Sequence, residues 1–286
     1  MKFDVKTISD QKRLVRGEQY LLARTKLRAR DHVHHKQWRV LIMAGGAPSG
    51  EIRAIQELMP KSHIVAVDRD ATCLDAAIQA GVDDVVQCDV YDWGPPLHKL
   101  NKFGPNKAIS SLGKFDVISL DLCGSVTDQS TELLKKYWQL LTFGGVMLFT
   151  FSYGRDVVEV FRSVAVGEKI LEQAEASGVS DMVVRRVRFL CGASSKLWGG
   201  LSSVMVYRGQ EMPMCSLLFA NSSSDEPCSW VRVESGDFEL AVVYPESANL
   251  YDCPQERIEG LRRRFAALKA AITRDGRRGE FQLVAK

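Results

Sequence analysis

The chain has 286 residues, of which 45% are hydrophobic, and its formal net charge at pH 7 is +3. No segment reaches the roughly 20 apolar residues of a membrane helix, the start lacks the apolar stretch of a secretory signal, and the seven scattered cysteines include no C-x-x-C pair. We therefore expect a cytoplasmic protein without membrane contact, disulfide framework or metal site, and we favour one large α/β domain with additions over two modest domains.

The segment before residue 38 is rich in basic side chains. Residues 12–39 contain nine Lys and Arg against two acidic residues. The sequence predicts one or two helices in this N-terminal extension, residues 1–37, with Arg24, Arg28 and Lys36 near the rim of a cleft, where they would attract phosphates. A solvated basic helix is the alternative, because charge runs often mark a solvent-exposed face.

Residues 39–70 have the pattern of a strand, a glycine-rich turn, a helix and a second strand. Val40–Met43 and Ile64–Val67 are short apolar runs, typical of buried parallel strands. The segment between them is long enough for a crossover helix. This part of the chain therefore predicts one βαβ unit.

The turn inside this unit has features of a nucleotide site. Gly45 and Gly46 permit a close approach of backbone to ligand, Pro48 suits the first turn of a helix, and Ser49 could cap it. Asp68 lies 22 residues beyond Gly46, near the interval of about 20 at which an acidic residue meets the ribose hydroxyls of an adenosine ligand. We predict a nucleotide-like ligand here; an ordinary tight turn with an unrelated Asp is the alternative.

The following segments alternate between helical and strand patterns, in the order Ala71–Ala80, Val85–Val90, Phe115–Leu122, Ser130–Leu141 and Val146–Phe151. A loop-rich insertion separates the second and third of them. Asp89 and Asp121 fall near the carboxyl ends of their strands, and Gly144-Gly145 precedes the last one. Right-handed crossovers then predict a doubly wound, mostly parallel sheet with its site at the carboxyl ends of the strands.

The rest of the chain is predicted to complete this α/β domain. We expect a helix at Arg155–Ser177, strands at Met182–Cys191, Ser203–Tyr207 and Cys215–Ala220, a strand pair within residues 231–245, a helix at Pro254–Thr273 and a ragged tail. The expected division is an N-terminal extension, a main domain over residues 38–220, and a C-terminal strand pair and helix, residues 221–286, packed on the same domain.

Taken together, these motifs resemble those of the class I S-adenosylmethionine-dependent methyltransferases, over about residues 38–207. The resemblance implies a Rossmann-like methyltransferase fold, with a mostly parallel, seven-stranded-type sheet and S-adenosylmethionine as cofactor. Gly45, Gly46 and Gly50 would surround its methionine part, Asp68 would take the ribose hydroxyls, and Asp121 would be catalytic, where the methyl group meets its acceptor. The full cofactor set is Ala44, Gly45, Gly46, Ala47, Pro48, Gly50, Asp68, Arg69, Asp89, Val90, Asp121 and Leu122, in which Asp89 and Val90 would face the adenine.

The acceptor is predicted from weaker likenesses. The GGAPSGE turn is similar to that of RNA ribose 2'-O-methyltransferases; Lys26 and Asp121 match half of their Lys-Asp-Lys-Glu set, whereas Thr150 and Met205 stand near the other two positions. The segment DLCGS resembles the D-P-F-G-S of tRNA guanine-N2 methyltransferases. The resemblance implies direct in-line methyl transfer to a nucleic acid, RNA ahead of DNA; a small molecule or protein side chain as acceptor, and a non-catalytic accessory protein, are the alternatives. The candidate substrate-binding residues are Arg24, Arg28, Cys123, Ser125 and Tyr153.

Overall fold

The computed structural model describes residues 10–31, 37–45, 48–91, 100–101, 104–105, 109–122, 124, 126–152, 176, 181–192, 200–208, 213–220, 228–235, 238–245 and 282–285. The chain divides into two compact units. Unit 1 contains Met1–Ile8, Arg16–Asp121 and Glu132–Leu148, and unit 2 contains Ser9–Val15, Leu122–Thr131 and Phe149–Lys286.

Unit 1 is built on parallel strands: β1 (Arg39–Met43), β2 (His63–Asp68), β3 (Asp84–Gln87), β6 (Phe115–Asp121) and the first part of β7 (Leu141–Ser152). They lie in the order β7-β6-β1-β2-β3. Strand β1 is parallel to β2 and β6, and β2 is parallel to β3. The Phe115 N–H donates to the Leu140 carbonyl at 2.8 Å, so β7 begins beside the start of β6 and is parallel to it.

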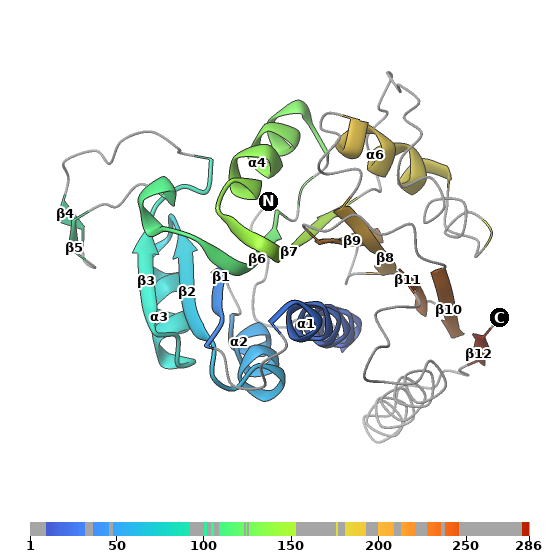
Figure 1. The fold of residues 1–286 in the computed structure, drawn as a ribbon, viewed down its shortest axis with the longest axis horizontal. Helices are drawn as coiled ribbons and strands as arrows, with labels where there is room; N and C mark the ends of the chain where they lie inside the picture. Colours follow the sequence, from blue (N-terminus) through green and yellow to red (C-terminus); the bar gives the residue numbers. More distant parts are fainter. Residues whose placement is uncertain are drawn as a thin grey trace. The chain divides into compact units, whose positions relative to one another are not determined.

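Numbered along the chain, these five strands have the order 3-2-1-4-5, which is that of a doubly wound α/β sheet. The predicted fold class is confirmed. The direction of winding reverses between β1 and β6, and in such sheets ligands bind outside the carboxyl ends of the strands at this switch point. Helices α2 (Ser49–Leu58) and α4 (Asp128–Trp138) lie on opposite sides of β1 and β6 (Figure 1).

The helices of unit 1 follow from local sequence. Asp70 caps α3 (Ala71–Gln79), because its side chain accepts the Thr72 N–H at 2.8 Å, and Gly81, at φ +92°, lies just beyond the helix. Strand β1 is fully buried through its apolar centre. The N-terminal segment forms one helix, α1 (Asp10–Asp31). The insertion contains a small hairpin, β4 (Leu100–Asn101) and β5 (Gly104–Pro105), and a 3-10 turn, η1 (Ile109–Leu112).

Unit 2 is dominated by antiparallel strands: β8 (Leu201–Arg208), β9 (Pro213–Ala220), β10 (Cys228–Ser235), β11 (Phe238–Pro245) and β12 (Gln282–Ala285). Their order is β12-β10-β11-β8-β9. The predicted strands near β8 and β9 and the strand pair β10-β11 are confirmed. The tail that we expected to be ragged contains β12, which pairs with β10.

Residues Met182–Cys191 are a helix and not the strand that we predicted. Helix α6 (Asp181–Gly192) buries Val183, Val184, Val187 and Leu190, which recur at helical spacing. The β-branched valines led to the strand prediction, but they form one continuous apolar face only in a helix.

Two predicted strand boundaries also differ. Strand β3 ends at Gln87, so Asp89 and Val90 follow the strand. Strand β7 begins at Leu141, so the Gly144-Gly145 pair lies inside it. The predicted helices at Arg155–Ser177 and Pro254–Thr273 lie outside the described residues, apart from the single residue 176.

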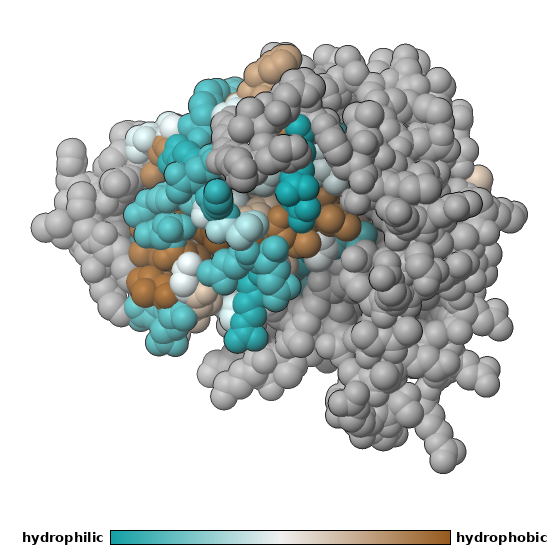
Figure 2. Space-filling model, turned by 60° about the horizontal axis from the view of Figure 1, so that its bottom comes forward, coloured by the Kyte–Doolittle hydropathy of each residue, from teal (hydrophilic) through white to brown (hydrophobic). Residues whose placement is uncertain are grey.

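On the face in Figure 2, the coloured side chains are mostly hydrophilic, with smaller hydrophobic areas between them. The large hydrophobic residues that are exposed include Ile78, Tyr91 and Phe143. Within the described residues, no helix is long and apolar enough to cross a membrane.

Candidate functional site

The glycine-rich turn and Asp68 meet at the carboxyl ends of β1 and β2. The Gly45 N–H donates to Oδ2 of Asp68 at 3.0 Å, and the Ala44 N–H donates to the Val67 carbonyl at 3.0 Å. Gly45 has φ +56°, which is the left-handed region, and a side chain there would meet no atom within 4 Å. The turn therefore presents backbone toward open space beside a carboxylate.

Asp68 also orders the segment that follows it. Its Oδ1 accepts the Asp70 N–H at 2.8 Å. Each oxygen thus holds one backbone N–H, and a carboxylate offers about four lone-pair sites in all. Asp68 retains the capacity to accept hydrogen bonds from a ligand. Burial raises the pKa of the nearby Cys73 thiol to about 11, with smaller contributions from Asp68 and Asp70.

Asp89, Val90 and Arg69 lie near the carboxyl end of β3. The Tyr91 N–H donates to Oδ1 of Asp89 at 2.9 Å, and the Arg69 guanidinium is 3.9 Å from Oδ2 of Asp89 in an exposed pair. The Val90 carbonyl accepts the hydroxyl of buried Tyr137 at 3.2 Å. Burial, and then the charges of Cys88, Asp89 and Tyr91, raise the pKa of Tyr137.

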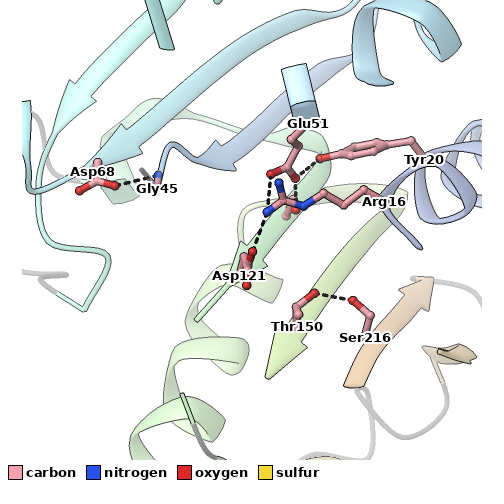
Figure 3. Close-up of polar contacts among 9 residues, drawn as sticks. Arg16, Tyr20, Gly45, Glu51, Asp68, Asp121, Thr150 and Ser216 are labelled. Carbon is pink, nitrogen blue, oxygen red and sulfur yellow. Dashed lines mark hydrogen bonds and ion pairs between the residues drawn. The ribbon is translucent and has the colours of Figure 1, made fainter. Parts of the chain in front are cut away.

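A buried ion cluster lies at the switch point. The Arg16 guanidinium, on α1, is 2.6 Å from Oδ2 of Asp121 at the end of β6 and 3.2 Å from Oε2 of Glu51 in the first turn of α2. Figure 3 shows the Arg16 side chain extending between the two acids. The exposed fractions of the Arg16, Asp121 and Glu51 side chains are 12%, 10% and 3%, so the cluster is largely removed from water.

Glu51 is fixed by two further donors. The Tyr20 hydroxyl donates to its Oε1 at 2.6 Å and the Ser119 hydroxyl donates to the same oxygen at 2.7 Å. Burial, followed by the negative charge of Glu51, raises the pKa of Tyr20 well above its ordinary value of 10.0. The hydroxyl therefore stays protonated and donates its proton to the carboxylate.

The sequence prediction missed Glu51, Arg16, Tyr20 and Ser119. Two signals in the sequence concern three of these residues. Glu51 directly follows the GGAPSG turn, and Arg16 and Tyr20 are four residues apart on a helix, so they share a face. Neither signal identifies the partner. The contact between Arg16 and Asp121 joins residues 105 positions apart.

Other predicted residues have structural contacts or are not described. Arg24 donates to the Leu58 carbonyl at 3.3 Å, at the end of α2, and Arg28 is half-buried. The Pro48 carbonyl accepts the N–H groups of Glu51 and Ile52, and no side chain caps α2, so the predicted Ser49 cap is wrong. Gly50 lies in the first turn of α2. The predicted site residues outside the described part of the chain are Lys36, Gly46, Ala47, Cys123, Ser125 and Tyr153.

Unit 2 contributes a separate polar contact. The hydroxyls of Thr150 on β7 and Ser216 on β9 are hydrogen-bonded to each other (Figure 3), and the Leu122 N–H donates to the Thr150 carbonyl at 3.2 Å. Met205 is fully buried and lies opposite Ser216 in the β8-β9 register. Thr150 and Met205 therefore belong to the packed sheet of this unit. Among the described residues, no group of three or more His, Cys, Asp or Glu is arranged to hold a metal ion.

The sequence matches no protein-family model and no curated protein. Among solved structures, the chain is similar to the plantazolicin methyltransferase BpumL in complex with SAH, at 10% identity and a TM-score of 0.44 over 73% of this chain and 85% of that one. It is similar to an O-methyltransferase family protein from Burkholderia thailandensis, at 15% identity and a TM-score of 0.42 over 74% of this chain and 55% of that one. It is also similar to an rRNA methylase from Streptococcus thermophilus, at 12% identity and a TM-score of 0.40 over 72% of this chain and 94% of that one. All three carry the name of a methyltransferase or methylase, the class that the sequence motifs resemble.

Proposed function

We propose that this chain is an S-adenosylmethionine-dependent methyltransferase. The observation that carries the proposal is the hydrogen bond from the Gly45 N–H to the Asp68 carboxylate, at the carboxyl ends of two adjacent parallel strands. Adenosine ligands bind at this place in doubly wound sheets, where a glycine turn admits the ligand and an acid accepts the ribose hydroxyls. In the same sheet, β6 lies on the other side of β1 from β2, across the switch point, and this strand ends in Asp121.

The residues at this site suit the cofactor. The open space beside Gly45 admits a ligand against the backbone, and Asp68 keeps lone pairs for two hydroxyl groups. S-adenosylmethionine supplies a methyl group that its sulfonium already activates. The protein then has to align an acceptor atom and, where this atom is protonated, remove a proton, and Asp121 is the carboxylate that we assign to this task.

As acceptor we propose a nucleic acid, RNA ahead of DNA, with the basic N-terminal segment as part of the binding surface. The support is the charge of this segment, which has nine Lys and Arg in residues 12–39. Binding would then weaken with salt, with a slope in log affinity against log concentration of about −0.7 to −0.9 per neutralised phosphate.

A small molecule or protein side chain is the second candidate acceptor. It is favoured by the contacts of Arg16 and Arg24, whose guanidinium groups bond to Asp121 and to the Leu58 carbonyl inside unit 1. These two cations of α1 are thus engaged within the protein. An acceptor without phosphates would bind with little dependence on salt.

The test is transfer of a labelled methyl group from S-adenosylmethionine to RNA, DNA and mixtures of small acceptors, at several salt concentrations. We expect transfer to RNA that falls steeply with salt and is lost in D121N. Transfer to small acceptors without salt dependence would favour the second candidate. Cofactor binding without transfer to any acceptor would indicate a non-catalytic relative and contradict the proposal.

A further inference from the structure

We propose that Arg16 of α1 is a positioning residue for methyl transfer, because it holds the Asp121 carboxylate ionised and fixed at the end of β6, with Glu51 as its second anchor. This inference rests on the proposed function, since it gives Asp121 a role in the reaction. It adds to the site a residue of α1, the helix that precedes the parallel sheet in the sequence.

The distances carry the first step. One nitrogen of the Arg16 guanidinium, Nη2, lies 2.6 Å from Oδ2 of Asp121 and 3.2 Å from Oε2 of Glu51. At such distances, and with little exposure to water, an opposite charge strongly favours the ionised form of a carboxyl group. Arg16 therefore favours the ionised form of Asp121 and fixes the direction of its carboxylate.

The second step is that Arg16 is itself held in place. Its partner Glu51 accepts hydroxyl protons from Tyr20 on α1 and from Ser119 on β6. Three elements, α1, α2 and β6, thus converge on one carboxylate (Figure 3). A guanidinium fixed by one acid can orient the other without losing its own position.

The third step separates positioning from ordinary stabilisation. The charged and titratable groups that face Asp121 include Arg16 directly, and Glu51 and Tyr20 through it. A close ion pair shifts the pKa of its carboxyl group whether or not it serves the reaction. A positioning role also requires the pH profile of methyl transfer to follow the Asp121 pKa when Arg16 is changed.

The experiment is a carbon-13 NMR titration of the Asp121 carboxyl carbon in the folded chain, assigned by comparison with D121N. The variants are R16Q, R16K and, as matched control, R39Q. Arg39 also contacts β6, but at its opposite end: its guanidinium donates to the Leu112 and Lys114 carbonyls and lies 4.7 Å from the centre of the Phe115 ring. The control thus removes an arginine of β1 that contacts the start of β6, and it leaves the cluster at the end of β6 untouched.

We expect R16Q to raise the pKa of Asp121 by about 1 to 3 pH units, since this is the effect of one close opposite charge. R16K should restore most of the original pKa, and R39Q should leave it unchanged. The acidic limb of the pH profile of methyl transfer should rise together with the Asp121 pKa in R16Q. Equal Asp121 pKa values in the wild type, R16Q and R39Q would overturn the proposal.

R16Q leaves two acids without their shared cation and can therefore unfold the protein. In that case E51Q and the double variant R16Q/E51Q provide the comparison, because the side-chain amide that replaces the Glu51 carboxylate still accepts the Tyr20 and Ser119 hydroxyls. The Asp121 pKa should be higher in R16Q/E51Q than in E51Q, and equal pKa values in these two variants would overturn the proposal. The titration needs no cofactor, so a chain that failed to bind S-adenosylmethionine would contradict the proposed function without altering this result.

Discussion

The backbone N–H of Gly45 donates to Oδ2 of Asp68 at 3.0 Å, although Gly45 follows β1 and Asp68 is the last residue of β2. Their strands are neighbours in register, with Met43 opposite Val67, so the bond joins the first residues beyond β1 to the last residue of β2. The carboxylate therefore holds the backbone of Gly45 in place. Changes at either residue should affect both the stability of the turn and the binding of a ligand beside it.

The first prediction concerns Gly45. G45A places a β-carbon on a residue at φ +56°, which costs about 1 to 2 kcal/mol for a non-glycine residue. We expect a loss of that size in the free energy of unfolding, measured by urea unfolding with tryptophan fluorescence. S-adenosylmethionine affinity should fall as well, because the turn must shift to relieve the strain.

Gly17 provides the matched control for that change. It lies within α1, its φ is not positive, and an added β-carbon would meet no atom within 4 Å. G17A should therefore stabilise the protein by about 0.5 to 1 kcal/mol, because alanine is the better helix former. The same loss in both variants would refute the role of the Gly45 conformation.

The second prediction compares two buried tyrosines. Y20F removes a hydrogen bond to the charged Glu51, whereas Y137F removes one to the neutral Val90 carbonyl. Y20F should cost about 1.5 to 3 kcal/mol of unfolding free energy and Y137F about 0.5 to 1.5 kcal/mol. Urea unfolding of both variants measures the difference, and a larger loss in Y137F would contradict an ionised Glu51.

The third prediction is loss of stability at high pH. The pKa of Tyr20 is raised in the folded protein, first by burial and then by Glu51, so the unfolded chain releases this proton at lower pH than the folded one. The stabilisation is complete below pH 10 and declines above it, by up to about 1.4 kcal/mol per pH unit for one group. Unfolding free energies measured from pH 8 to 11 should fall less steeply in Y20F, and parallel curves would argue against this assignment.

The fourth prediction concerns cofactor affinity. D68N keeps an acceptor for the Gly45 N–H but loses the charge, so S-adenosylmethionine should bind about ten- to a hundredfold more weakly. D84N is the control, because Asp84 lies at the other end of the neighbouring strand β3, with a largely exposed side chain paired to His63. Calorimetric titration of both variants measures the effect, and equal affinities would remove Asp68 from the site.

The sequence predicted those parts of the fold that depend on neighbouring residues. The run at Val40–Met43, the turn at Gly45 and the acid at Asp68 are each visible within a window of 30 residues, and the structure brings them together as expected. The doubly wound sheet was predicted from the rule of right-handed crossovers, whereas the order of its strands comes from the structure. Helix α6 was mistaken for a strand because β-branched residues were weighed above their spacing.

The cluster at the switch point could not be predicted in the same way. Arg16 and Asp121 are far apart in the sequence, and nothing local to either residue indicates the other. The basic segment predicted Arg24, Arg28 and Lys36 near the rim of a cleft, and it did not predict Arg16, whose guanidinium bonds to Asp121. Arg24, for which the sequence suggested phosphate contacts, donates to the Leu58 carbonyl inside unit 1. Likewise β12 pairs with β10 across about 50 residues, a register that composition alone does not encode.

The most direct test of the central claim is calorimetric titration of the wild-type chain with S-adenosylmethionine and S-adenosylhomocysteine. A glycine turn joined to Asp68 beside the switch point predicts binding of one molecule per chain with an affinity in the micromolar range. Failure of both compounds to bind at millimolar concentration would contradict the assignment of this site and leave the fold without its proposed cofactor.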